Sequence, residues 1–270
     1  MTATSRRRGQ GVVEQVVGRG SGGGVFPRLR SCGSLGVVSE STLVTLHLWG
    51  VPSRAVPRAV LHMAADRAPL RRTPGLRFAK LLGTGSGRTF TPRDADPRRW
   101  GVLAVWDDAS AATAFDQGDV VRAWRRFAQE EWVARLRPLS ARGQWSRQEP
   151  FGRPTPYRWE GRVAAVTRAR LVLHCAVRFW RAVPPVTVDL HEAPGLRLAL
   201  GIGEAPLGLQ GTFSIWTSSA ALNAFAYDRA AHAAVVERTE RERWYAEELF
   251  ARFGVLSTRG TLSGVDPLRG

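Results

Sequence analysis

An internal repeat constrains the fold of this chain more than any other feature of its sequence. The segment PGLRFAKLLG at 74–83 matches PGLRLALGIG at 194–203 at six of ten positions. Two further pairs of segments match in the same order, 106–115 with 216–225 and 130–146 with 247–263. Three ordered matches indicate two copies of one folding unit, divided near a proline-rich stretch after residue 149.

The first copy reads as six elements in the order strand, helix, strand, strand, helix, strand. The expected elements are an apolar strand over 43–50, an amphipathic helix over Arg54–Arg67, a strand opening at the PGLR motif, a strand ending at Trp106, a helix capped by Asp107 that runs to the Glu130–Glu131 pair, and a strand over 132–139. Apolar periodicity and helix-capping residues carry this reading.

The second copy has the same order of elements. The expected elements are a strand over 162–173, a helix over 176–190 that Pro184 and Pro185 kink or divide, a strand opening at the second PGLR motif, a strand ending at Trp216, a helix capped by Ser218, and a strand over 249–256. Both copies therefore have the order βαββαβ.

This order is that of the ferredoxin-like unit, an antiparallel sheet with helices on one face. Two units in one chain bury their bare sheet faces against each other, whereas units lying side by side would expose a large apolar patch. The sequence predicts an α+β fold in which two tandem ferredoxin-like units form a fused dimeric α+β barrel. The expected division is a disordered leader over 1–41, one unit over 42–149 and a second unit over 160–263.

Composition favours a globular protein that does not span a membrane. Of 270 residues, 44% are hydrophobic, and no apolar run approaches the length of a membrane-spanning helix. The net charge is +16, but 38 of the 39 basic residues are arginine and they are spread along the chain, which is typical of a GC-rich coding bias. Two distant cysteines, Cys32 and Cys175, form no disulfide framework. We expect a cytoplasmic protein that binds no nucleic acid.

The two copies differ by two insertions. The first copy has a longer glycine-rich stretch over 83–99, which lacks the P-loop pattern and which we interpret as a mobile loop. The second copy has about two extra helical turns within 226–245. They place His232 on one stripe with Asp228, Val235, Val236 and Thr239. This histidine is either an axial ligand of haem iron or a core residue with a hydrogen-bond partner.

Motifs for other chemistries are absent from the sequence. There is no HExxH or C2H2 spacing for a metal site, and no GxSxG elbow for a serine nucleophile. The acidic pair Glu247–Glu248 is repeated as Glu130–Glu131, which favours a structural role for both pairs. His174 and His191 are the next candidates for a haem ligand after His232.

Several strings of residues resemble the spheroidene monooxygenase family of carotenoid-modifying enzymes. The resemblance covers residues 41–263 and is carried by FAKLLGTGSGRTFTP, WGVLAVWDD, VRFWRAVP, LALGIGEAPLGLQGTFSIW and, most specifically, AHAAVVERTERERWYAEELFARF. It implies a monooxygenase of the dimeric α+β barrel superfamily that inserts oxygen into a long apolar polyene, with haem as the oxygen-activating cofactor and an external electron donor.

The resemblance also suggests roles for individual residues. It implies His232 as the iron ligand, because its placement on a helix of the C-terminal half matches that superfamily. The candidate partners of the haem propionates are Arg178, Arg181 and Arg238, and the candidate substrate-binding residues are Trp180, Trp216, Trp244 and Tyr245. A surface role for each arginine and core packing for each aromatic residue stay open as alternatives.

Three functions remain to be compared. The first is a haem monooxygenase that acts on an acyclic carotenoid. The second is a cofactor-independent monooxygenase of the same fold, and the third is a ligand-binding module without catalysis. A membrane-dissolved substrate would also bring the protein to the inner face of a membrane as a peripheral contact.

Overall fold

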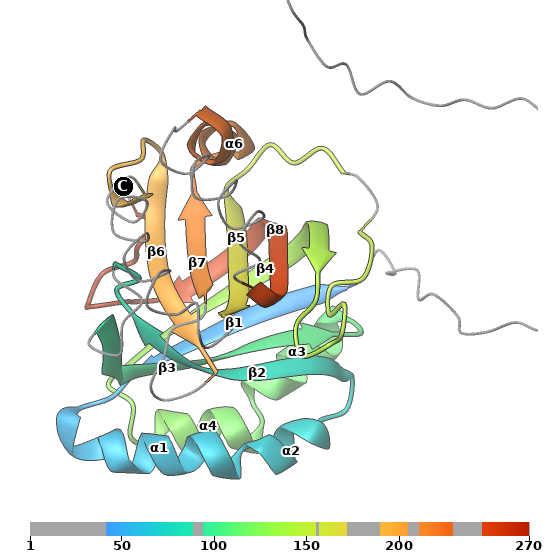
Figure 1. The fold of residues 1–270 in the computed structure, drawn as a ribbon. Helices are drawn as coiled ribbons and strands as arrows, with labels where there is room; N and C mark the ends of the chain where they lie inside the picture. Colours follow the sequence, from blue (N-terminus) through green and yellow to red (C-terminus); the bar gives the residue numbers. More distant parts are fainter. Residues whose placement is uncertain are drawn as a thin grey trace, which may run out of the picture. The chain divides into compact units, whose positions relative to one another are not determined.

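The structure, a computed structural model, describes residues 42–88, 94–154, 157–171, 190–204, 211–228 and 245–269 (Figure 1). Residues from Gly36 to Gly270 belong to one compact unit, and only this unit is discussed below. The leader expected over 1–41 lies outside the described residues. Every helix in the described part is too short or too polar to cross a bilayer.

Eight antiparallel strands close into a barrel. Their order around it is β1-β3-β2-β6-β7-β5-β8-β4, and β4 pairs with β1 to complete the ring. The strands are β1 (Leu43–Gly50), β2 (Leu76–Gly85), β3 (Ala95–Trp106), β4 (Glu130–Gly143), β5 (Val163–Leu171), β6 (Leu196–Gly203), β7 (Gly211–Trp216) and β8 (Tyr245–Gly260). The barrel leaves no free sheet edge, which removes the edges on which strands of other chains could pair.

The two halves of the chain share one strand order. The first four strands lie as β4-β1-β3-β2 and the last four as β8-β5-β7-β6. A short seam joins β2 to β6, where Gly83–Gly85 pairs with Gly203–Gly201, and a long seam joins β4 to β8. The antiparallel sheet with flanking helices confirms the predicted α+β class, and the strand expected over 43–50 is β1.

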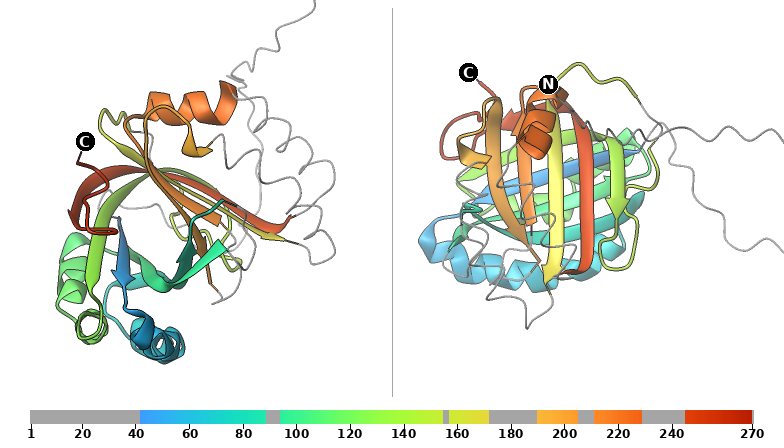
Figure 2. Two further views of the ribbon diagram at one scale, coloured as in Figure 1. Left: turned by 90° about the vertical axis from the view of Figure 1, so that its left-hand side faces the viewer. Right: turned by 45° about the horizontal axis from the view of Figure 1, so that its top comes forward.

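Helices cover the outside of the barrel. In the first half they are η1 (Ser53–Ala55), α1 (Val56–Ala65), α2 (Arg67–Arg71), α3 (Ala109–Asp116) and α4 (Asp119–Arg125), and in the second half α6 (Ser219–Asp228). Figure 2 shows α6 on the opposite side of the barrel from α1. The helix predicted over 176–190 lies outside the described residues except at its end.

The second helical region of the first half differs from the prediction. We expected one helix from Asp107 to Glu130, but α3 ends at Asp116 and α4 ends at Arg125, so the glutamate pair opens β4. The break falls at Gly118, which is the N-cap of α4. The N-cap of α3 is Asp108 and not Asp107, since its carboxylate accepts hydrogen bonds from two backbone N–H groups of the first turn.

The N-cap predicted in the second half is confirmed. The Ser218 hydroxyl accepts a hydrogen bond from the backbone N–H of Ala221, at 3.1 Å.

The glycine-rich loop is shorter than predicted, because β2 continues to Gly85 and β3 begins at Ala95. Both strands extend into the glycine-rich segment, and its glycines gave no sequence signal for a strand.

The core has three parts. Alternate residues of all eight strands point inward and fill the barrel, among them Leu46, Leu103, Trp132 and Phe213. A second cluster lies between the outer sheet face of the first half and helices α1 to α4. A third and smaller described cluster lies beneath α6 on the outer face of the second half. A barrel of eight strands is wide enough for side chains and for little else.

Candidate active site

Most of the site residues expected from sequence lie outside the described residues. These are His232, Arg178, Arg181, Arg238, Trp180 and Trp244. Tyr245 begins β8, where its backbone pairs with Leu171, but its side chain is not described. The roles assigned to these residues stay predictions.

Trp216 is the one predicted pocket residue whose side chain is described. It is fully buried on the outer face of β7, and its Nε1 donates a hydrogen bond to Ser214 Oγ at 2.9 Å. Its ring packs against Phe225 of α6 in a tilted arrangement, with centroids 5.1 Å apart. Trp216 therefore packs in the core between the sheet and α6, which is the alternative to substrate binding given for it in the sequence analysis. Its contact with substrate stays a prediction.

The strand pairing defines which residues of the two halves correspond. Leu43 pairs with Trp106, and Val163 pairs with Trp216. Because the two tryptophans head matching motifs, residues of β1 correspond to residues of β5 that lie 120 positions later. The PGLR motifs give the same shift between β2 and β6, and the shift between β3 and β7 is 110.

Corresponding positions on the outer sheet face differ sharply in size. In the first half, the side chains that lie between the sheet and the helices include His47, Trp49, Leu81 and Val102, all buried. Their counterparts in the second half are Thr167, Ala169, Gly201 and Thr212. We call these four residues the small-residue floor.

The small-residue floor is continuous across three neighbouring strands. Thr212 of β7 pairs with Thr167 of β5 on one side and with Gly201 of β6 on the other. In the first half Val102 pairs in the same way with His47 and Leu81, where the indole of Trp49 also fills the layer. The second half thus carries small residues at positions where the first half carries bulky, buried side chains.

The end of the β2–β3 hairpin reaches this floor from the first half. Gly87 has a φ of 69°, and a Cβ at Gly87 would lie 2.9 Å from the backbone nitrogen of Gly201. Glycine is required there both by the backbone conformation and by the close approach. The glycine-rich stretch of the first copy therefore contributes to the edge of a surface of the second copy.

His191 lies beside the same hairpin. Burial and the neighbouring Arg88 lower the pKa of His191, and the backbone of Ser86 forms a hydrogen bond with its ring. Its Nε2 atom is buried and makes no hydrogen bond. A neutral imidazole held through one nitrogen, with the other nitrogen available, is the state that a metal-ligating histidine requires.

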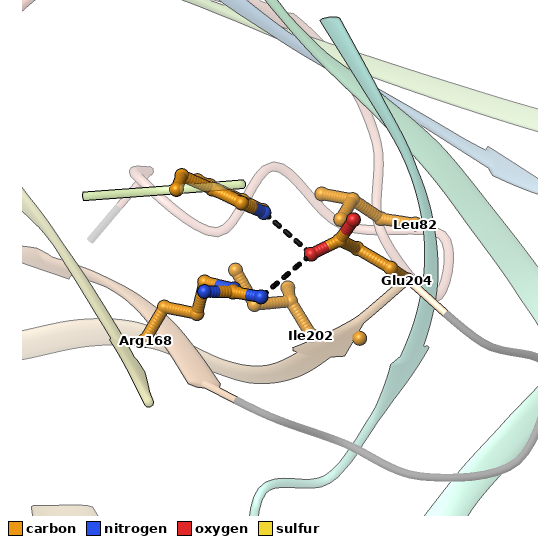
Figure 3. A pocket seen from close by; sticks show the side chains of 6 residues that line it. Leu82, Arg168, Ile202 and Glu204 are labelled. Carbon is orange, nitrogen blue, oxygen red and sulfur yellow. Dashed lines mark hydrogen bonds and ion pairs between the residues drawn. The ribbon is translucent and has the colours of Figure 1, made fainter. Parts of the chain in front are cut away.

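A second polar site lies inside one end of the barrel. Figure 3 shows the guanidinium group of Arg168 pointing toward the carboxylate of Glu204. Glu204 Oε1 accepts hydrogen bonds from Trp145 Nε1 at 2.6 Å and from Arg168 Nη2 at 2.9 Å, and Oε2 lies 2.7 Å from Lys80 Nζ. Burial alone would raise the pKa of Glu204, but the Lys80 and Trp145 hydrogen bonds lower it.

The other side of Arg168 is held by Glu247, which forms an ion pair with it. Glu247 also accepts hydrogen bonds from the backbone N–H groups of Ser146 and Arg147, at 2.9 and 2.8 Å. These two residues have φ values of 56° and 60°, which a two-residue hairpin turn requires. We call Lys80, Trp145, Arg168, Glu204 and Glu247 the polar pole; its two cations and two carboxylates balance.

The hollow beside the polar pole is too small for a long polyene. It has an empty volume of about 160 Å³, open mouth included, and is lined by Leu82, Trp145, Arg168, Ile202, Gly203 and Glu204. Pockets for small organic ligands begin near 300 Å³. Among the described residues, the barrel interior therefore offers no room for such a substrate, and the polar pole ties the two halves together instead.

The described residues contain no group of three or more histidine, cysteine, aspartate or glutamate side chains that could hold a metal ion. The described part of the chain thus offers no site for iron ligated by the protein alone. Haem iron is different, because the macrocycle supplies most of its ligands and the protein needs to supply only one axial side chain. A single histidine would therefore be enough to hold haem.

No protein-family model matches the chain. Curated relatives do match it, and each is named spheroidene monooxygenase. The protein of Rhodobacter capsulatus is 39% identical over 220 residues, which cover 79% of this chain and 90% of the relative. The protein of Rubrivivax gelatinosus is 40% identical over 202 residues, which cover 74% and 77% of the two chains.

Solved structures resemble the fold. An aldoxime dehydratase in complex with butyraldoxime matches with a TM-score of 0.51 at 11% identity, covering 80% of both chains. A second aldoxime dehydratase matches with the same TM-score at 12% identity, covering 80% of this chain and 82% of that one. At this level of identity the likeness concerns the fold alone. The curated relatives decide the identity: this protein is a monooxygenase and belongs to the spheroidene monooxygenase family.

Proposed function

We propose that this protein is a haem-dependent monooxygenase that inserts one oxygen atom into an acyclic carotenoid. The observation that carries the proposal is the small-residue floor of a chain whose relatives are named spheroidene monooxygenase. The relatives' name supports the reaction and the substrate class, and the floor supports the place where a flat cofactor would bind.

The floor fits a planar group by its shape. A Trp, a Leu, a Val and a His at Ala169, Gly201, Thr212 and Thr167 would fill the layer, as their counterparts do in the first half. The second half lacks those side chains on three adjacent strands. A rigid planar macrocycle needs such a continuous surface of backbone and small side chains.

Two histidines are the candidates for holding the iron. His232, the sequence-based prediction, lies in the helical insertion of the second copy. His191 is described, has a pKa lowered by burial and by the neighbouring Arg88, and has a buried Nε2 that makes no hydrogen bond. When bound, haem would supply the activation of O2. Arg178, Arg181 and Arg238 remain the proposed propionate partners.

The reaction must balance with an external donor. One oxygen atom of O2 joins a substrate carbon and the other leaves as water, which consumes two electrons and two protons. Described residues beside the floor on β5, β6 and β7 are apolar or hydroxylic, among them Ala165, Ala199 and Ser214, and such residues suit a hydrocarbon substrate. On the β8 side the neighbours are charged, because Glu248 pairs with Ala169 and Arg252 pairs with Ala165.

We also propose that the barrel arose from tandem ferredoxin-like units that form a fused dimeric α+β barrel. The support is the identical strand order of the two halves together with the ordered sequence matches. One unit then kept its packed outer core, while the other lost the bulky side chains of that layer and became available for chemistry.

The test is a visible spectrum of the protein expressed with added haem precursor. We expect a Soret band in the parent protein and its loss in His232→Ala, with His191→Ala and His62→Ala measured in parallel. His62 lies on α1 beside Asp66 and serves as the control for removing an imidazole. Loss of the band in His191→Ala alone would transfer the ligand role to His191.

Two other outcomes would overturn the proposal. A colourless parent protein that oxygenates the carotenoid would establish the cofactor-independent monooxygenase. A parent protein that takes up haem but never oxygenates a carotenoid under reducing conditions would refute the proposed reaction and leave only the cofactor.

A further inference from the structure

The outward surface of η1, α1 and α2 is unusually cationic. It exposes five arginines, Arg54, Arg58, Arg67, Arg71 and Arg72. None of them forms an ion pair within 4 Å among the residues that the structure describes. By contrast, Arg122 on α4 is paired with Asp119 at 2.6 Å.

This surface also lacks an exposed carboxylate. The only acidic residue over 51–75 is Asp66, which is 6% exposed. Its carboxylate accepts a hydrogen bond from Trp124 Nε1 at 2.8 Å and lies 3.2 Å from His62 Nδ1. Asp66 therefore faces the core, and nothing on the outward surface offsets the arginines.

Exposed apolar side chains lie among these arginines. Leu61 is 69% exposed and Val60 is 42% exposed, although Ala59 and Met63 on the other face of α1 are buried. Arg54, Arg58, Leu61 and Ala65 follow a spacing of four, three and four residues, which places them on one stripe of the helix. No folding requirement explains a leucine exposed to this degree.

We propose that the outward surface of η1, α1 and α2 docks on a membrane rich in anionic lipids. The arginines complement lipid phosphates, and Leu61 and Val60 reach the boundary between headgroups and acyl chains. A nucleic acid would also attract the arginines, but it offers no apolar layer for an exposed leucine at their centre. The proposal depends on this surface and stands apart from the oxygenase chemistry.

The test measures flotation of the full-length protein with lipid vesicles. One set of vesicles is phosphatidylcholine alone, and in the other a third of the lipid is phosphatidylglycerol. We expect binding to the anionic set only. At about 1 kcal/mol per arginine near the surface, each arginine changes the partition coefficient about fivefold, so R54Q/R67Q/R71Q should weaken binding roughly 100-fold.

A matched variant separates this surface from the overall charge. R153Q/R158Q/R269Q removes three exposed arginines outside η1, α1 and α2 and changes the net charge by the same amount. It should bind anionic vesicles within about threefold of the parent, because charges beyond about 10 Å are screened. Leu61→Gln should weaken binding several-fold at a salt concentration that screens the arginines.

Several outcomes would overturn the proposal. They are an absence of binding to the anionic vesicles, equal losses in the two triple variants, and tight binding of an RNA probe by a protein that ignores vesicles. Far-ultraviolet circular dichroism and urea unfolding of each variant show whether the fold is intact. Among the described residues, the side chains of Arg54, Arg67 and Arg71 form no ion pair, and those of Arg158 and Arg269 form only exposed ones with Glu160 and Asp266. Exposed pairs contribute little to stability, so we expect nearly unchanged unfolding.

Discussion

The outer sheet faces of the two halves have the same strand order, but their side chains differ greatly in size. Trp49 of the first half stacks on Trp124 with ring centroids 5.0 Å apart, whereas its counterpart Ala169 has one methyl group. The strand order is therefore compatible with both bulky and small side chains in this layer. The fold requires a sheet, but it does not require bulky residues on both outer faces.

The two ends of the barrel interior show a second contrast. The polar pole includes Lys80, Arg168, Glu204 and Trp145, and the corresponding residues at the other end are Leu200, Leu48, Thr84 and Leu262. Glu247 corresponds to Glu130, and each accepts hydrogen bonds from the hairpin turn in the opposite half. The charged side chains of Lys80, Arg168 and Glu204 are thus present at one end only, whereas the glutamate that accepts hydrogen bonds from the turn is present at both ends.

The first prediction fills the small-residue floor. Ala169→Trp restores the indole found at Trp49, and we expect loss of the Soret band and a fall in turnover of about 100-fold or more, since a misplaced group has such a cost. The control Ala114→Trp adds an indole on the exposed face of α3 and should leave both unchanged. Normal haem uptake by Ala169→Trp would show that the floor is not the cofactor site.

The second prediction truncates a bulky side chain in the outer layer of the first half. Trp49→Ala should lower the free energy of unfolding by about 3 to 5 kcal/mol, because the indole is fully buried. Ala169→Gly, the corresponding truncation in the second half, should cost about 1 kcal/mol. Urea unfolding measures both. Equal losses would mean that the two outer layers are packed alike.

The third prediction concerns the polar pole. Arg168→Leu leaves the nearly buried Glu247 without its cation and should cost about 3 kcal/mol. K80L/R168L/E204T installs the residues of the opposite end and should cost about as much as the single change, because both variants leave Glu247 without Arg168 and with the two N–H groups of the turn. A triple variant less stable than Arg168→Leu would show that the charges are needed for the fold.

The fourth prediction concerns His47, the first-half residue that corresponds to Thr167 of the second half. Its Nε2 lies 3.3 Å from Asp116 Oδ1, but neither ring nitrogen forms a hydrogen bond of good geometry. Burial lowers the pKa of His47 below the 6.5 of the unfolded chain. The unfolded chain therefore takes up a proton first, and stability is lost as the pH falls below about 6.5.

The loss from His47 should reach about 1 kcal/mol at pH 5.5. His191 contributes in the same direction, so the measurement is the difference in urea unfolding between the parent and His47→Gln across this range. Glu131 adds nothing there, since burial opposes its ionisation but contacts with His47 and Arg125 lower the pKa of Glu131 to about 2. Parallel pH curves for the two proteins would refute the assignment.

Local signals in the sequence predicted the elements well where they were strong. The apolar run of β1 and the Ser218 cap match the structure. The N-cap at Asp108 and the break at Gly118 were missed, because two adjacent aspartates offer equal caps and a lone glycine inside a helical pattern is ambiguous.

The candidate site was only partly accessible from sequence. The insertion with His232 stood out as a difference between the copies, and so did the glycine-rich stretch whose Gly87 meets Gly201. The small-residue floor was missed. The three repeated segments do not include β1 or β5, so the repeat by itself gives no position-by-position correspondence for these strands.

The sequence by itself determined the α+β class and the family, and it predicted a duplicated βαββαβ unit. Only the tertiary structure decided which residues meet. Closure of the barrel pairs β2 with β6 and β4 with β8, which brings Lys80, Arg168 and Glu247 to one end although more than seventy residues separate each from the next. Local periodicity shows which side of a strand a residue faces, whereas the register between distant strands depends on packing of the whole barrel.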